Sequence, residues 1–101
     1  MTHRIDLKPE YLEIITDIVG RCLLPHPKIW IFGSRTQSTA KPFSDIDLLI
    51  DIGRPVTIQE LSALNNYFDE SLLPYKVDIA DACTISGEFR AKIRDQLVSL
   101  Q

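Results

Sequence analysis

Features that mark several classes of protein are missing from this sequence. Its two cysteines, Cys22 and Cys83, lie too far apart in the chain to match the close spacing of metal-binding cysteine pairs. No apolar run approaches the roughly 20 residues of a membrane-spanning helix. The N-terminus carries no signal-peptide pattern. We therefore expect a cytoplasmic protein with no membrane partner, whose cysteines are reduced.

An excess of positive charge is missing as well. The 11 lysines and arginines are outnumbered by 14 aspartates and glutamates, so the formal net charge is −3. Domains that bind nucleic acid usually display a basic patch that neutralises backbone phosphates. The charge balance therefore argues against direct nucleic-acid binding and against a processive polymerase. It leaves small-molecule and protein acceptors open.

Internal repeats, low-complexity tracts and long linkers are also absent. The chain has 101 residues, of which 45% are hydrophobic and 25% charged, and this composition is typical of a globular protein. We expect one domain over residues 1–101. It is large enough to bury a core but too small to include a second domain for an acceptor.

The apolar residues that are present follow the helix period in three places. Helical spacing begins at Pro9, which suits a first helical turn, and again after Thr57, which forms a capping-box pattern with Glu60. A third helix is expected near the C-terminus. Four apolar residues should form its buried stripe: Phe89, Ile93, Leu97 and Leu100.

Short apolar runs at residues 28–32, 45–52 and 76–80 have the length of strands. Neighbouring positions are apolar in the first two runs, so both faces of the sheet should be covered. The order of helices and strands predicts an α/β (α+β) fold with a three-strand mixed sheet and flanking helices. Asp81, directly after the third run, is expected to cap the following turn.

The residues that carry chemistry lie around the first two strands. Gly33 and Ser34 form a small polar turn, where glycine lets the backbone approach and N–H groups and a hydroxyl can bind a phosphate. Asp45 and Asp47 open the second strand on one face, about 7 Å apart along the backbone. Such carboxylates suit Mg²⁺ or Mn²⁺, which bind hard oxygen ligands together with substrate phosphates. The combination indicates phosphoryl or nucleotidyl transfer.

Gly33-Ser34, ten residues, and then Asp45-Ile46-Asp47 resemble the signature of the DNA polymerase β-like nucleotidyltransferase superfamily. Within it the chain is similar to the minimal members, the MNT proteins, which resemble the catalytic domain alone and are often paired with HEPN-domain proteins. A third carboxylate of that family lies on a later strand in a context like Val-Asp-Ile, and Val77-Asp78-Ile79 matches it. The resemblance covers nearly the whole chain and implies a minimal polymerase β-like core.

The resemblance implies roles for particular residues. Three aspartates would be catalytic and bind the metal: Asp45, Asp47 and Asp78. Four residues would bind the nucleotide: Gly33, Ser34, Arg35 and Ser44. It also implies ATP or another nucleoside triphosphate as substrate and Mg²⁺ or Mn²⁺ as cofactor. Asp78 lies inside an apolar run, where a buried carboxylate is costly without a partner. That cost is itself a sign of function.

The implied reaction is the transfer of a nucleoside monophosphate, AMP from ATP, to a hydroxyl acceptor. The resemblance implies a hetero-oligomer with a HEPN-type helical partner, often a toxin ribonuclease, and places this chain as the antitoxin of a toxin–antitoxin pair. The acceptor would then be a tyrosine of the partner, and its AMPylation would silence the partner.

Two alternatives stay open at this point. The first is a nucleotidyltransferase that acts on a small hydroxylated molecule such as an antibiotic. The second is an antitoxin that works by contact alone. After Gly-Ser the family's run resembles Arg-Ala-Arg-Gly, whereas residues 35–38 read Arg-Thr-Gln-Ser, and this departure keeps the contact-only alternative open. The three intact aspartates favour a transferase.

Overall fold

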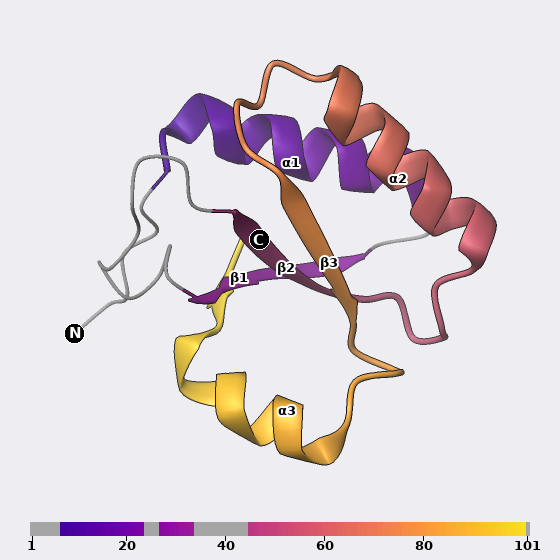
Figure 1. Ribbon diagram of the computed structural model, residues 1–101, viewed down its shortest axis with the longest axis vertical. Helices are drawn as coiled ribbons and strands as arrows, with labels where there is room; N and C mark the ends of the chain where they lie inside the picture. The colour runs from indigo at the N-terminus through magenta and orange to yellow at the C-terminus, as the bar shows by residue number, and fades with distance from the viewer. Residues whose placement is uncertain (1–6, 24–26, 34–44, 101) are drawn as a thin grey trace.

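The computed structural model describes residues 7–23, 27–33 and 45–100. Its helices and strands follow in this order: α1 (Pro9–Cys22), β1 (Lys28–Phe32), β2 (Ile46–Asp51), α2 (Ile58–Glu70), β3 (Val77–Asp81), α3 (Gly87–Ile93), a 3-10 helix (Arg94–Gln96) and β4 (Val98–Ser99). Figure 1 shows α1 and α2 on one side of the sheet and α3 on the other. The expected α+β architecture, a sheet with flanking helices, is confirmed.

The strands of the described residues form one mixed sheet in the order β3-β2-β1-β4. β2 runs antiparallel to β1 and parallel to β3. The mixed character agrees with the prediction, but the sheet has four strands where three were expected. The additional strand is β4, which pairs antiparallel with β1 and places Ser99 opposite Trp30.

The expectation of one long C-terminal helix is wrong, because α3 ends at Ile93 and the chain then turns back to the sheet. Leu97 packs with the apolar cluster on the α3 side, whereas Leu100 packs with the cluster on the α1 and α2 side. A helical stripe cannot reach both faces of a sheet, but an extended segment directs side chains to both. The predicted helix and its first two stripe residues, Phe89 and Ile93, are confirmed. The spacing of Leu97 and Leu100 fitted a continued helix only by coincidence.

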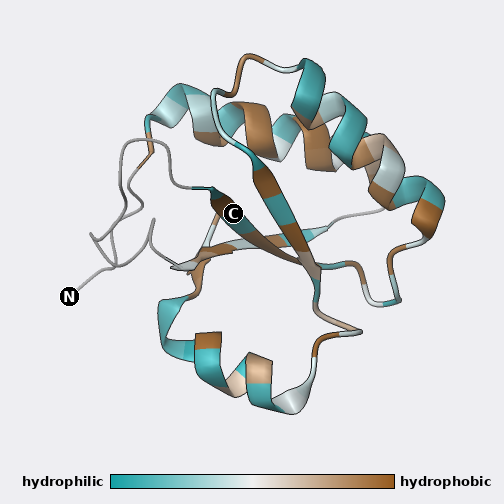
Figure 2. Cartoon of the chain, viewed as in Figure 1, coloured by the Kyte–Doolittle hydropathy of each residue, from teal (hydrophilic) through white to brown (hydrophobic). Residues whose placement is uncertain are grey.

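The core lies on both faces of the sheet, as the apolar runs predicted. Ile46, Leu48 and Ile50 of β2 are fully buried against α1 and α2. Leu49 faces the other way, into the smaller cluster under α3 with Phe32. Hydrophobic segments (brown) lie along the strands and alternate with hydrophilic ones (teal) along α1 and α2 (Figure 2). Since Asp47 alternates with Leu48, it lies on the α3 face.

Side-chain caps fix the connections around this core. The predicted capping box is confirmed, since the Thr57 hydroxyl accepts from the Glu60 N–H and the Glu60 carboxylate accepts from the Thr57 N–H. The Asp81 carboxylate accepts from the Cys83 N–H at 2.9 Å, which confirms its predicted cap. It also accepts from the Val56 N–H at 2.7 Å. Asp81 thus ties the end of β3 to the segment that enters α2.

The helices of the described ranges are short. The longest, α1, has 14 residues, whereas a membrane span needs about 20. No helix within residues 7–23, 27–33 and 45–100 is therefore long and apolar enough to cross a bilayer.

Alanine substitutions should distinguish a buried leucine of α2 from an exposed leucine by their effect on stability. Leu64 is completely buried and Leu72 is 87% exposed. We expect Leu64→Ala to lower the free energy of unfolding by about 2–5 kcal/mol, because it removes buried methyl groups and leaves a cavity. The matched variant Leu72→Ala should change it by less than about 0.5 kcal/mol. Urea denaturation measures both values, and equal losses would contradict the described packing of α2.

Candidate active site

The predicted carboxylates gather at one end of the sheet. Asp47, the second residue of β2, is the register partner of Asp78 on β3 and of Phe32 on β1. Neighbouring strands lie about 4.8 Å apart, and residues paired in register point to the same face. Asp45 directly precedes β2 and is exposed. The site therefore lies where the parallel strands β2 and β3 begin and where β1 ends and leads into Gly33.

The charges of this cluster oppose one another. Burial raises the pKa of Asp47, and the carboxylates of Asp78 and then Asp45 raise it further. Both causes disfavour the ionised form, because the charge loses water and meets like charges. Asp47 thus experiences the field of both other predicted carboxylates.

The expectation that Asp78 carries the cost of burial is wrong. Its side chain is 52% exposed, and its Oδ1 lies 3.9 Å from the Lys76 ammonium. The reason is the position of β3 at the edge of the described sheet, where no further described strand covers the outer side of Asp78. The carboxylate that loses water is Asp47, which lies on β2 between β1 and β3.

Gly33 occupies a position that requires glycine for two reasons. Its φ is +82°, in the left-handed region that other residues rarely adopt. A Cβ at this position would lie 2.5 Å from Asp47 Oδ2, far inside contact distance. The turn after β1 and the Asp47 carboxylate therefore pack directly against each other.

The Gly33 N–H has a protein partner in this structure. It donates to Gln96 Oε1 at 2.9 Å. The sequence suggested N–H groups of this turn for a phosphate, and it gave no indication of Gln96, which was expected within the last helix. The contact joins residues 63 positions apart, a separation at which no local pattern predicts pairing.

Several predicted residues lie outside the described ranges. Ser34, Arg35 and Ser44, expected to bind the nucleotide, fall within residues 34–44, and so do Gln37 and Ser38. Of the residues predicted for the site, the structure brings together Gly33, Asp45, Asp47 and Asp78.

The donor atoms of this cluster fit a divalent cation. Within the described ranges, no three histidine, cysteine or acidic side chains are already arranged around one ion position. Asp47 and Asp78 nevertheless face each other across paired strands, and a cation would offset the repulsion that raises the Asp47 pKa. Mg²⁺ and Mn²⁺ commonly bind through one or two carboxylates and take their other ligands from water and substrate phosphates. Two facing carboxylates are sufficient for such a site.

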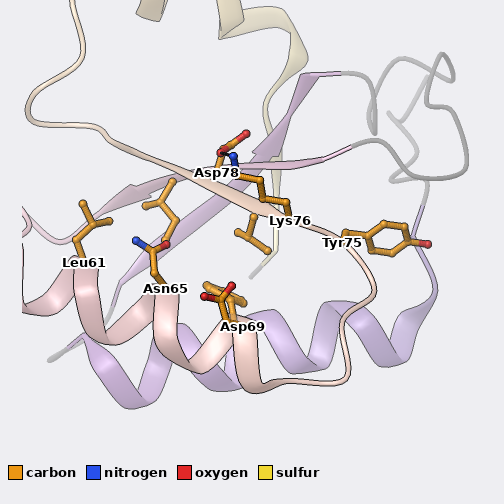
Figure 3. A pocket seen from close by; sticks show the side chains of 9 residues that line it. Leu61, Asn65, Asp69, Tyr75, Lys76 and Asp78 are labelled. Carbon is orange, nitrogen blue, oxygen red and sulfur yellow. Dashed lines mark ion pairs between the residues drawn. The ribbon is translucent and has the colours of Figure 1, made fainter.

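A cavity of about 420 Å³ adjoins the free edge of β3, on the side of α2. Leu61, Asn65 and Asp69 of α2 line it together with residues of β3. Figure 3 shows the Asp78 side chain on the other side of the β3 ribbon from Asn65 and Asp69. Asp78 also belongs to the lining of the cavity, so the cavity borders the carboxylate cluster at this residue.

Comparison with known proteins agrees with this geometry. A family model described as a nucleotidyltransferase domain matches residues 12–100. The chain is 39% identical over 98 residues to a Haemophilus influenzae protein named "Probable protein adenylyltransferase MntA", and the match covers 97% of this chain and 85% of that relative.

Solved structures share the fold. A crystal structure of a toxin–antitoxin with AMP-PNP contains a chain that matches with a TM-score of 0.77 at 21% identity, over 89% of this chain and 72% of that one. A structure of a tri-AMPylated Shewanella oneidensis HEPN toxin in complex with an MNT antitoxin gives a TM-score of 0.61 at 18% identity, over 89% of this chain and 71% of the other. At these identities the likeness establishes the fold.

The contact between Gly33 and Asp47 can be tested with a matched glycine. Gly53 also has a left-handed φ, +79°, but a Cβ there would meet nothing within 4 Å. We expect Gly33→Ala and Gly53→Ala each to cost about 1–2 kcal/mol of stability for the left-handed backbone. Only Gly33→Ala should displace the Asp47 carboxylate, because its methyl group takes the same space. The carboxyl ¹³C signal of Asp47 reports this, and equal shifts in both variants would contradict the packing.

The raised pKa of Asp47 predicts a pH-dependent gain from removing its charge. In the presence of EDTA, ionised Asp47 destabilises the fold, and the penalty is complete above its folded pKa. Asp47→Asn should therefore unfold at a higher temperature than the wild type at pH 7. The difference should shrink as the pH falls toward about 4, where the unfolded aspartate also takes up a proton. Thermal unfolding at several pH values measures this, with the exposed Asp69→Asn as control; a pH-independent difference would refute it.

Proposed function

Because the chain belongs to the nucleotidyltransferase domain family, we propose that it transfers AMP from ATP to a hydroxyl group of a protein partner. The observation that carries this proposal is the 39% identity, over nearly the whole chain, to a protein named as a protein adenylyltransferase. Membership of the family makes the chain a nucleotidyltransferase. Its nucleotide, its metal and its acceptor are the proposed parts.

The aspartates are proposed to hold the metal and to carry the chemistry. Asp47 of β2, Asp45 directly before that strand and Asp78 of β3 would bind Mg²⁺ or Mn²⁺. The bound metal supplies positive charge that stabilises the reacting phosphate oxygens. The raised Asp47 pKa supports this assignment, because a cation is the partner that such a cluster of like charges needs.

Asp78 is the residue we propose for the acceptor side. Its side chain is half exposed at the edge of the sheet, so a hydroxyl of another molecule can approach it from solvent. Asp47 lies between two strands and is less accessible. Asp78 could then accept the proton of the attacking hydroxyl as a general base. The new bond forms between the acceptor oxygen and the α-phosphorus of ATP, and pyrophosphate leaves.

The turn after β1 is proposed to hold the triphosphate. Gly33 begins this segment and lies against the Asp47 carboxylate, whose Oδ2 would be 2.5 Å from a Cβ at position 33. Ser34 and Ser44 would contribute hydroxyl groups, and Arg35 a guanidinium that binds phosphate oxygens. This arrangement would deliver the α-phosphate to the aspartates.

The proposed acceptor is a tyrosine of a HEPN-type partner, with this chain as the antitoxin. Support comes from proteins of the same fold, one in a toxin–antitoxin with AMP-PNP and one in a complex whose HEPN toxin is AMPylated. AMP on the partner would place a bulky, charged group where the toxin needs a free surface. The antitoxin would then act by chemistry and not by contact alone.

The test is transfer from α-labelled ATP to the product of the adjacent gene, followed by intact-mass analysis. We expect AMP adducts with Mg²⁺ and none with EDTA. Asp45→Asn, Asp47→Asn and Asp78→Asn should each lower the rate at least about 100-fold, because each removes a charge aimed at the reacting phosphate. Asp51→Asn is the matched control, since it lies on the same strand and an asparagine can still accept the Gly53 N–H bonded there at 2.8 Å.

The possible outcomes separate the alternatives. Transfer by Asp45→Asn at the wild-type rate would overturn the metal assignment. A tight complex without adducts would favour an antitoxin that acts by contact. Labelling of a small hydroxylated molecule without labelling of the protein would favour the small-molecule transferase.

A further inference from the structure

A side chain from the C-terminal part of the protein reaches the start of the candidate nucleotide turn. Gln96, the last residue of the 3-10 helix, accepts the Gly33 N–H through Oε1 at 2.9 Å in a partly buried hydrogen bond. We propose that Gln96 is a positioning residue of the nucleotide site. It fixes Gly33, and through Gly33 the position of the Asp47 carboxylate. This inference rests on the proposed function, since it assumes that the turn holds ATP.

The register of the sheet shows what Gln96 contributes. β4 pairs with β1 at Trp30–Ser99 and Ile31–Val98. Continued by two residues, the same antiparallel register would bring Gly33 opposite Gln96. The backbone pairing has ended before that point, because the chain there is leaving the 3-10 helix. The Gln96 side chain therefore supplies to Gly33 the acceptor that a longer strand would have supplied from its backbone.

Gly33 benefits from an external acceptor because it has no side chain of its own. Glycine reaches many backbone conformations, so its left-handed φ of +82° must be selected by its surroundings. Asp47 Oδ2 lies only 2.5 Å from the position that a Cβ of residue 33 would take. A shift of Gly33 would therefore also change the space open to that carboxylate. A hydrogen bond to the Gly33 N–H thus restrains both Gly33 and the adjacent candidate metal ligand, Asp47.

The group at position 96 that accepts the Gly33 N–H must be uncharged. A glutamate at position 96 could accept the same N–H, but it would add a negative charge beside Asp47, which already meets Asp78 and Asp45. That charge would repel the phosphates of ATP. An amide oxygen accepts the hydrogen bond without this repulsion. Substitutions of Gln96 can therefore remove the hydrogen-bond acceptor and the neutral charge separately.

The experiment compares three variants of the full chain. Gln96→Met keeps the length and removes the amide acceptor, Gln96→Glu keeps an acceptor and adds charge, and Asp95→Asn changes an exposed neighbour in the same 3-10 helix. Amide hydrogen exchange of Gly33, followed by NMR, reports the contact. The dissociation constant of Mg-ATP reports the nucleotide site, and kcat at saturating ATP reports the chemical step.

We expect Gly33 exchange to be about tenfold faster in Gln96→Met and unchanged in Gln96→Glu and Asp95→Asn. The dissociation constant of Mg-ATP should rise about three- to tenfold in Gln96→Met, the size of one lost hydrogen bond. It should also rise in Gln96→Glu, through charge, and stay constant in Asp95→Asn. In Gln96→Met kcat should change less than about twofold, since the aspartates remain.

Two results would overturn the positioning role. In the first, Gly33 exchange is the same in Gln96→Met and wild type, so the contact does not control Gly33. In the second, exchange accelerates but Mg-ATP binds equally well, so the contact is structural only. Failure of the proposed function gives a different pattern: the wild type then binds Mg-ATP no better than Asp47→Asn, whatever the Gly33 exchange rate. The role of Gln96 in nucleotide binding would be refuted with it.

Discussion

The parallel pairing of β2 with β3 is the constraint on which the site depends. It holds Asp47 beside Asp78, although two carboxylates on neighbouring strands repel each other. The sheet keeps them together because Ile46, Leu48 and Ile50 of the same strand are completely buried on the opposite face. Burial of apolar surface thus supplies the free energy that holds the charges in place. The two carboxylates therefore repel each other in the folded protein, and a bound divalent cation would reduce this repulsion.

On the α3 face of the sheet, β2 and β3 each change from an apolar to an acidic residue between neighbouring positions of that face. Leu49 and Ala80 belong to the cluster under α3, and two residues earlier on the same strands stand Asp47 and Asp78. Since a strand returns to the same face every second residue, the two aspartates continue the rows that α3 covers. Helix α3 therefore packs directly beside the site, and the chain that follows it is well placed to deliver Gln96.

The sequence predicted what depends on local spacing. The apolar runs and the capping pattern of Thr57 with Glu60 located strands and helices, and the two-residue spacing of Asp45 and Asp47 placed both at the start of β2. The prediction failed where long-range contacts decide. β4 has two residues and exists because β1 offers it a partner. The edge position of β3, which exposes Asp78, and the bond from Gly33 to Gln96 likewise follow from the assembled sheet.

The edge position of β3 in the described sheet also bears on pairing with strands of other chains. An uncovered strand offers unpaired backbone groups that can recruit a strand of another chain, and natural sheets discourage this with charged side chains. Lys76, directly before β3, and Asp78 have exposed charged side chains, so charges stand at the start of this edge. A charge at the position of Asp78 also disfavours the addition of a strand from another chain. A family that lost its activity would still have reason to keep a charge there.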